Sequence, residues 1–268
     1  MIIYINDVCG LIFMSKVVCI SNQKGGVGKT TTAVNIAACL SAYEKKVLLI
    51  DADPQANATS GLNISADNGK PTVYECLAGT AEVVDAVYRT QMKNLYLMPA
   101  NSDLAGIEVE LVNVKEREYF FKKNIINKIK DDYDYIFIDT PPSLGLLTIN
   151  ALTASDSVLI PMQCEYYSLE GISRLMQTIK LVNQRLNKNL CVEGVLFTMF
   201  DGRANLTNQI VSEVKKYFGK KIYENVIPRN VKLPESSSFG KPIILYDINS
   251  KGAVYYLELT KEFLSKAA

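Results

Sequence analysis

Residues 16–31 read KVVCISNQKGGVGKTT, an apolar run followed by a glycine-rich loop and a Lys-Thr-Thr sequence. Glycine lets backbone N–H groups close around phosphate oxygens, and the N-terminus of a following helix adds the positive end of its dipole. The Lys29 ammonium can reach the β- and γ-phosphates of a nucleotide, and the Thr30 hydroxyl can hold Mg²⁺. The stretch therefore predicts a strand, a phosphate-binding loop and a helix. The residues expected to bind the phosphates of ATP are Gly25, Gly26, Val27, Gly28, Lys29, Thr30 and Thr31.

The loop departs from the standard pattern at its first position. The motif G-x-x-x-x-G-K-[ST] requires glycine where this chain has Gln23, and an additional lysine, Lys24, stands directly before the glycine pair. The form KGGVGKTT resembles the deviant Walker A motif of the family that includes ParA/Soj, MinD, nitrogenase iron protein and the arsenite-pump ATPase. In that family the early lysine reaches across a dimer interface to the partner's nucleotide. The resemblance therefore implies an ATP-binding and catalytic role for Lys24.

Two acidic segments complete the predicted site. Asp139 ends the apolar run YIFID, which delivers a carboxylate to the sheet edge near Mg²⁺ as a Walker B residue does. Asp53 follows a second apolar run, and Pro54 leaves its carboxylate in a loop that faces the γ-phosphate. Because the chain has no histidine, Asp53 is the best candidate to position or activate the hydrolytic water, and Asp51 is expected to assist by hydrogen bonding near the metal. The expected metal-site residues are Thr30, Asp53 and Asp139.

Composition narrows the class of protein. The 268 residues are 48% hydrophobic and 21% charged, with a formal net charge of +1, so the chain is globular and any nucleic-acid binding must come from a local patch. The absence of histidine excludes Ser–His–Asp and Cys–His catalysis and the zincin motif. The six cysteines form no C-x-x-C pair, and several lie in apolar runs such as VVCIS and AACLS, where we expect buried small hydrophobes in a reducing compartment. No apolar run is long enough to cross a membrane.

Apolar runs and helical spacing alternate along the chain. Strands are expected at Lys16–Ile20, Lys46–Asp51, Leu95–Met98, Tyr135–Asp139, Ser157–Pro161, Cys191–Met199 and Lys221–Tyr223. Helices are expected at Thr30–Tyr43, Thr72–Leu77, Val83–Val87, Leu104–Leu111, Glu116–Ile129, Gly145–Ala154, Leu169–Leu186, Asn205–Phe218 and Ala253–Ser265. The polar stretch that precedes Lys70 is expected to hold no element.

Repeated strand–helix units predict one α/β domain of the P-loop NTPase type, with a mostly parallel twisted sheet and helices on both faces. Residues 14–268 are expected to form the deviant Walker A ATPase domain, of the AAA_31 or CbiA-like P-loop type. Residues 1–13 are expected to be an N-terminal extension, either an artefact of an upstream start or a loose segment outside the fold.

Within the deviant Walker A family, the chain is most similar to ParA/Soj. The segments LLIDADPQANATSGL, DYIFIDTPPSLGLLTINAL and IPRNVKLPESSSFGKPIILYD carry this resemblance, although PESSSFGKP stands where the family more often has SEAPS. The resemblance implies an ATPase, weak unless stimulated, that dimerises with ATP and Mg²⁺. It further implies non-specific binding to double-stranded DNA, a ParB-type partner in chromosome or plasmid segregation, and a cytoplasmic, nucleoid-associated location.

The same resemblance assigns further binding residues. Pro228 and Asn230 match family positions that flank the adenine. Arg203 matches a basic residue implicated in DNA contact, while Arg229 and Lys232 are expected to add contacts to DNA phosphates, which need positive charge rather than sequence readout.

Three other functions compete with partitioning. A MinD-like regulator of division-site placement would share the ATP site but needs a basic amphipathic C-terminal helix that binds membranes, whereas this chain ends in KEFLSKAA. An iron–sulfur reductase would need cysteine ligands in a suitable context. A small-molecule kinase or ordinary GTPase would not explain Lys24, and the base-specific N-K-x-D motif is absent.

Overall fold

Strands buried on both faces organise the fold of the computed structural model, which describes residues 15–66, 69–166 and 168–267. The strands are β1 (Lys16–Ile20), β2 (Val47–Asp51), β3 (Tyr88–Arg89), β4 (Leu95–Met98), β5 (Tyr135–Asp139), β6 (Ser157–Gln163), β7 (Cys191–Phe200) and β8 (Ile227–Pro228). They form one sheet in the order β3-β4-β2-β5-β1-β6-β7-β8. Only the pair β3–β4 is antiparallel in this sheet, so the prediction of a mostly parallel sheet is confirmed.

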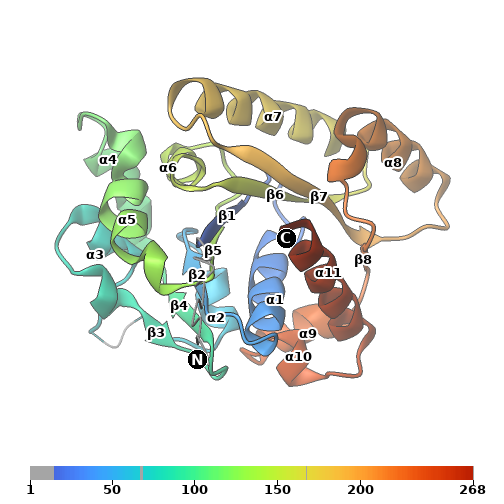
Figure 1. The fold of residues 1–268 in the computed structure, drawn as a ribbon, viewed down its shortest axis with the longest axis horizontal. Helices are drawn as coiled ribbons and strands as arrows, with labels where there is room; N and C mark the ends of the chain where they lie inside the picture. The colour runs from blue at the N-terminus through green and yellow to red at the C-terminus, as the bar shows by residue number, and fades with distance from the viewer. Residues whose placement is uncertain (1–14, 67–68, 167, 268) are drawn as a thin grey trace, which may run out of the picture.

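Helices cover both faces of this sheet (Figure 1). They are α1 (Lys29–Ala42), α2 (Asn57–Gly61), α3 (Val73–Ala78), α4 (Ile107–Glu110), α5 (Asn127–Ile129), α6 (Leu146–Ala154), α7 (Ser168–Arg185), α8 (Asn205–Phe218), α9 (Lys232–Ser238), α10 (Ile243–Tyr246) and α11 (Lys251–Ala267). Helices α6, α7 and α8 lie over one face, and α1 and α11 lie side by side on the other. The single α/β domain with two helical layers is therefore confirmed.

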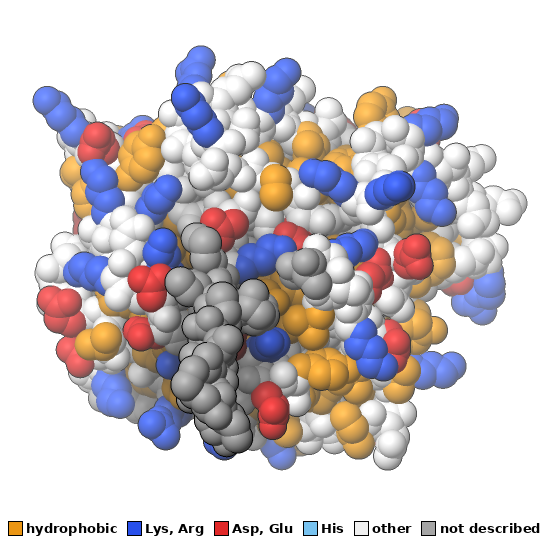
Figure 2. Space-filling view, viewed as in Figure 1, with side chains coloured by type: hydrophobic (Ala, Val, Ile, Leu, Met, Phe, Trp, Pro, Cys, Tyr) orange, Lys and Arg blue, Asp and Glu red, His pale blue; other side chains and the backbone are white. Residues whose placement is uncertain are grey.

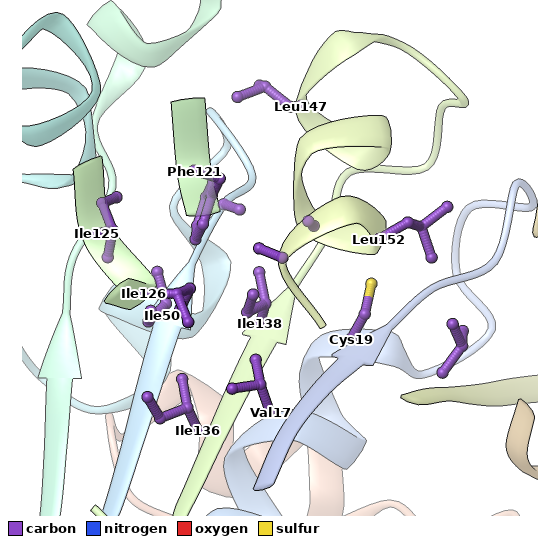
Figure 3. Packing of buried hydrophobic residues seen from close by; sticks show 14 of the residues in the cluster. Val17, Cys19, Ile50, Phe121, Ile125, Ile126, Ile136, Ile138, Leu147 and Leu152 are labelled. Carbon is purple, nitrogen blue, oxygen red and sulfur yellow. The ribbon is translucent and has the colours of Figure 1, made fainter. Parts of the chain in front are cut away.

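The apolar strands divide their side chains between two cores. Along β1, Val17 and Cys19 enter one core while Val18 and Ile20 enter the other. Strands β2 and β5 alternate in the same way. Figure 3 shows the first core, in which strand residues meet side chains of α6 and of the segment that contains α5. Since successive side chains of a strand point to opposite faces, a run that is apolar throughout requires a cover on each face.

The predicted helix Glu116–Ile129 is interrupted in the structure. It consists of a 3₁₀ turn at Arg117–Tyr119, a π turn at Lys122–Ile126 and α5. The cause is Asn150 of α6, whose side-chain oxygen accepts a hydrogen bond from the Phe121 N–H at 3.0 Å while its amide donates to the Arg117 carbonyl at 2.9 Å. These two backbone groups are an i→i−4 pair, so an inserted side chain replaces one helical hydrogen bond.

Two further predictions about local structure are wrong. Helix α2 lies in the polar stretch expected to hold no element. The predicted strand Lys221–Tyr223 contributes only an isolated bridge between Ile222 and Val195. The predicted short helix at Val83–Val87 is present as a 3₁₀ helix at Val83–Ala86. The short elements β3, α9 and α10 were not anticipated, and the expected extension at residues 1–13 lies outside the described residues.

Candidate functional site

The carboxyl ends of three neighbouring strands define the site. Ile20 at the end of β1 is in register with Asp139 at the end of β5, and Asp139 is in register with Asp51 at the end of β2. Parallel strands end at the same edge of a sheet, where ligands of open α/β folds bind. The glycine-rich loop and both acidic segments therefore meet at one edge.

The loop between β1 and α1 has a conformation that requires glycine at two positions. Gly26 and Gly28 have φ values of 73° and 82°, in the left-handed region that side chains with a Cβ rarely adopt. Gly28 is the residue that precedes α1, and its carbonyl accepts the Thr32 N–H at 2.9 Å. Helix α1 therefore begins at Lys29, with its N-terminal N–H groups directed to the space in front of the loop.

Strands β6 and β7 hold this loop from the side. The Leu159 carbonyl accepts the Ser21 N–H at 3.2 Å, and the Pro161 carbonyl accepts the side-chain amide of Asn22 at 2.7 Å. The Gln163 amide donates to the Gly26 carbonyl at 2.8 Å. On β7, the buried Thr198 hydroxyl donates to the Val27 carbonyl at 2.7 Å.

None of these anchoring residues was predicted from sequence. Their residue types are unremarkable, and only the pairing of β1 with β6 and of β6 with β7 brings them to the loop. Carbonyl groups that are bonded to β6 and β7 leave the loop N–H groups available to an anion.

A cavity of about 520 Å³ lies in front of the loop. Its lining includes seven of the predicted phosphate-binding or catalytic residues, namely Gly25, Gly26, Gly28, Lys29, Thr30, Thr31 and Asp53. Further lining residues come from α2 and α9 and from two strand ends; these are Asn57, Ser60, Gly61, Pro142, Met199, Pro234, Ser237 and Ser238. Val27 is buried beneath the loop, 1% exposed.

Two predicted adenine contacts do not line this cavity. The Asn230 side-chain oxygen instead accepts the Lys232 N–H at 2.8 Å, at the start of α9, and Pro228 belongs to β8. The residues that α9 presents to the cavity are Pro234, Ser237 and Ser238, in the segment that departs from the SEAPS pattern.

Asp139 is the most unusual group in the site. Both of its carboxylate oxygens are buried, and neither has a hydrogen-bond partner among the described residues. Burial raises its pKa well above the usual value, and the neighbouring Asp51 adds to this, while the Thr30 hydroxyl and the Lys29 ammonium act in the opposite direction. A buried carboxylate without a partner requires an explanation such as a bound ion.

The residues present fit Mg²⁺. This ion prefers oxygen ligands and takes only one or two carboxylates when it also binds nucleotide phosphates. Among the described residues no three His, Cys, Asp or Glu side chains cluster as a metal site. The residues expected at the metal, Thr30, Asp53 and Asp139, would supply a hydroxyl and two carboxylates, and the nucleotide and water would supply the remaining ligands.

Lys29 is a buried cation that interacts electrostatically with Asp139 and Asp53. It is 6% exposed, and burial lowers the pKa of its ammonium although Asp139 and Asp53 attract the charged form. A buried cation beside two carboxylates, one of which has no hydrogen-bond partner, can pair with phosphate at little further desolvation cost.

Asp53 and Asp51 have different environments. Asp53 is 6% exposed, and its Oδ1 accepts the Gln55 N–H at 3.0 Å, while no described residue hydrogen-bonds its Oδ2. Asp51 is fully buried, and its oxygens accept the Thr59 N–H at 2.8 Å, the Thr59 hydroxyl at 2.7 Å and the Asp53 N–H at 3.2 Å. Burial raises the pKa of Asp51 to about 6. Asp51 therefore orients the loop that carries Asp53 and the helix that follows it.

Lys24 lies outside the cavity that its neighbours line. Its ammonium forms a salt bridge with Glu165, in the connection between β6 and α7, and its side chain lines a separate hollow with Gln23, Glu170, Gly171 and Arg174. The backbone N–H of Lys24 donates to the Asn22 side chain at 3.0 Å. Lys24 is therefore directed away from the cavity of its own chain.

The three predicted DNA-binding cations lie on exposed loops and on α9. Arg203 is 91% exposed and binds both Asp201 oxygens, at 2.8 and 2.7 Å. Hydrogen bonds from Arg203 and the charge of nearby Arg229 lower the pKa of Asp201 to about 2. Lys232 forms an ion pair with Glu235 at 3.0 Å. Arg229 is exposed, and no ion pair of it occurs in the described part of the chain.

Comparisons with known proteins identify the family. A family model described as an AAA domain matches residues 15–192. Over 249 residues the chain is 57% identical to the sporulation initiation inhibitor protein Soj of Bacillus subtilis, an alignment that covers 93% of this chain and 98% of that protein. The chain belongs to the ParA/Soj family. It is also 54% identical over 253 residues to the chromosome partitioning protein ParA of Myxococcus xanthus, covering 94% of this chain and 89% of that protein.

Membership of the ParA/Soj family fixes the general activity. The chain is an ATPase with a ParA-type role in segregation, and the MinD-like alternative is not supported. A solved structure of cobyrinic acid a,c-diamide synthase from Mycobacterium smegmatis, which holds ADP and magnesium, has the same fold; it is 36% identical, with a TM-score of 0.82 and 94% of each chain covered. In the described part of this ParA/Soj chain, no helix is long and apolar enough to cross a membrane.

Proposed function

We propose that this chain is an ATP-driven dimerisation switch that binds double-stranded DNA without sequence specificity and releases it after hydrolysis. ATP and Mg²⁺ are its cofactors. The observation that supports the proposal most is the different location of the two loop lysines. Lys29 is buried in the cavity, whereas Lys24 lies outside it and pairs with Glu165. A lysine directed away from its own nucleotide site can bind the phosphates of a second subunit once it leaves Glu165.

Within one subunit, the loop N–H groups, Lys29 and Asp53 have distinct roles in hydrolysis. The loop N–H groups and Lys29 bind the phosphates, and Asp53 orients the water that attacks the γ-phosphorus to give ADP and phosphate. Bound Mg²⁺ would neutralise charge on the β- and γ-phosphates. Oδ1 of Asp53 is fixed by the Gln55 N–H, which leaves Oδ2 to accept a hydrogen bond from the water.

The cross-subunit role of Lys24 explains why hydrolysis by the isolated chain would be weak. A monomer lacks the second lysine at its phosphates, so charge that develops on the leaving group is less well stabilised. A ParB-type partner would stimulate hydrolysis by favouring the arrangement in which both lysines are engaged. Hydrolysis would then weaken the dimer.

DNA binding would come from a small surface patch formed by Arg203, Arg229 and Lys232. The chain as a whole carries a net charge of only +1, and Lys and Arg side chains are interspersed with acidic and hydrophobic ones on the face in Figure 2. Each neutralised phosphate contributes about −0.9 to the slope of log K against log salt. One patch therefore binds weakly, and ATP-dependent pairing of two patches produces useful affinity by avidity. This binding would place the protein on the nucleoid.

The proposal is tested by gel shift of a non-specific DNA duplex with ATP, with ADP and without nucleotide, over a series of salt concentrations. We expect a shift only with ATP, with equal affinity for unrelated sequences and a steep salt dependence. Light scattering under the same conditions should show a dimer only with ATP. Equal DNA binding with ADP and ATP would contradict the proposal.

A further inference from the structure

Strand β6 and the connection that follows it contact the phosphate-binding loop at every second residue. The Leu159 carbonyl, the Pro161 carbonyl and the Gln163 side chain each bond to the segment between Ser21 and Gly26. Glu165 continues this alternate series just beyond the end of β6, and its carboxylate binds the Lys24 ammonium. The first three contacts fix the backbone and the side chain of Asn22, whereas the fourth fixes the one lysine of the loop that lies outside the cavity.

We infer that Glu165 is a positioning residue that holds Lys24 on its own subunit until the phosphates of a partner's ATP displace the carboxylate. The inference rests on the proposed cross-subunit role of Lys24. An ammonium group that is engaged by a carboxylate is not free to bind phosphate, so dimerisation exchanges one anion for another. The chemical class of the displacing group is the triphosphate of a nucleotide bound to a second copy of this chain.

The exposure of the pair makes this exchange feasible. The Lys24 and Glu165 side chains are 33% and 51% exposed, so the salt bridge is weakened by water and salt. After release, the Glu165 carboxylate can be rehydrated without movement of the fold. A fully buried pair would instead leave an unpaired charge in the interior and would resist exchange. ATP carries more phosphate charge than ADP, so it competes more strongly with the Glu165 carboxylate for the Lys24 ammonium. Release of Lys24 from Glu165 is therefore favoured in the ATP state.

The test compares the dimer dissociation constant of the wild type and of Glu165→Gln by sedimentation with saturating ATP. Removal of a competing exposed carboxylate should tighten the ATP dimer by about two- to fivefold, with a smaller difference at high salt. Glu165→Asp keeps the charge and should restore the dissociation constant toward the wild-type value. Glu213→Gln, which removes a carboxylate that pairs with Lys216 on exposed α8, is a matched control and should leave the dimer unchanged.

The double variant Lys24→Gln/Glu165→Gln separates the inference from the function on which it rests. If Glu165 acts through Lys24, the double variant should be as monomeric as Lys24→Gln. An unchanged or weaker dimer in Glu165→Gln would overturn the positioning role alone, as would a tighter dimer that persists when Lys24 is absent. A normal ATP dimer of Lys24→Gln would overturn the cross-subunit role itself, and the positioning role with it.

Discussion

Asp51 and Asp139 are register partners at the ends of adjacent parallel strands, yet only one of the two buried carboxylates has hydrogen-bond partners among the described residues. Asp51 accepts two hydrogen bonds from Thr59 and one from the Asp53 N–H. Asp139 accepts none within hydrogen-bond geometry. The two strand ends therefore differ: Asp51 fixes the loop that carries Asp53, whereas the Asp139 carboxylate has no hydrogen-bond partner among the described residues.

In the variant Asp139→Asn, the free energy of unfolding should no longer depend on Mg²⁺. The neutral isostere removes the desolvation cost of a buried carboxylate but also the attraction of that carboxylate for the buried Lys29 ammonium, so the two effects offset and the free energy of unfolding of the nucleotide-free protein should change by less than about 1–3 kcal/mol. The same variant should lose the additional stabilisation that Mg²⁺ gives in the presence of ATP, along with hydrolysis. Thermal unfolding with ATP, with and without Mg²⁺, measures both effects. Retention of the Mg²⁺-dependent increase would show that the ion binds elsewhere.

The matched variant Asp51→Asn should behave in the opposite way. An asparagine side chain cannot accept all three hydrogen bonds, and a buried donor left unsatisfied costs about 1–3 kcal/mol. The nucleotide-free protein should therefore be less stable, while Mg²⁺ still adds to the stabilisation by ATP. If Asp51→Asn abolished the Mg²⁺ effect as completely as Asp139→Asn, Asp51 would have to be counted as a metal ligand.

Variants of Lys29 and Asp53 should have different effects on ATP binding and on ATP hydrolysis. Lys29 meets phosphate in the ground state, so Lys29→Ala should weaken ATP binding by about 100-fold or more, because it removes one partner of a buried charge pair. Asp53→Ala should keep ATP affinity but slow hydrolysis by about 100-fold or more, which is typical for loss of a group that orients a reacting water. The Asp53→Ala variant should therefore accumulate as a dimer with ATP bound. Equal losses of ATP affinity in both variants, measured by equilibrium dialysis, would refute this division of roles.

Thr198 should affect nucleotide affinity although it lies behind the loop. Its hydroxyl donates to the Val27 carbonyl at 2.7 Å, and Thr198→Val keeps the shape but leaves that carbonyl without this donor. We expect a loss of about 1–3 kcal/mol in stability and weaker ATP binding. The control Thr260→Val removes a buried hydroxyl that donates to the Tyr256 carbonyl in α11, and should reduce stability alone. Calorimetric titration with ATP that shows no difference between the two variants would exclude the anchoring role.

The sequence was sufficient to predict the strands that carry the site. A run such as VLLID or YIFID is apolar at every position before its final Asp and only five residues long, which favours a strand covered on both faces with the Asp at the sheet edge. The glycine-rich loop motif then predicts that this edge binds the phosphates of a nucleotide. The fold class and the position of Lys29, Thr30, Asp53 and Asp139 followed from these local signals.

Long-range side-chain contacts were not predictable in this way. Helix α2 is polar and has no side-chain cap, but Asp51 fixes it through Thr59, which is eight residues further along the chain. Asn150 breaks the predicted helix at Phe121 from a different element. Glu165 meets Lys24 only because β6 lies beside β1. The Asn150 and Glu165 contacts depend on how distant elements pack against each other, which a single sequence does not specify.

The last prediction concerns the carboxylates that accompany the DNA-binding cations. Asp201 binds Arg203 and Glu235 binds Lys232, so the proposed patch has three cations against two carboxylates. Both pairs are exposed and can be exchanged for phosphate, but each carboxylate also repels the DNA backbone. Asp201→Asn should therefore strengthen ATP-dependent DNA binding severalfold, whereas Arg203→Glu should abolish it while the ATP dimer survives. The measurement is a gel shift over a salt series, in which loss of one phosphate contact per subunit reduces the slope by about 0.9 per contact. If Arg203→Glu still shifted duplex DNA with an unchanged slope, the DNA contacts would have to lie on another surface.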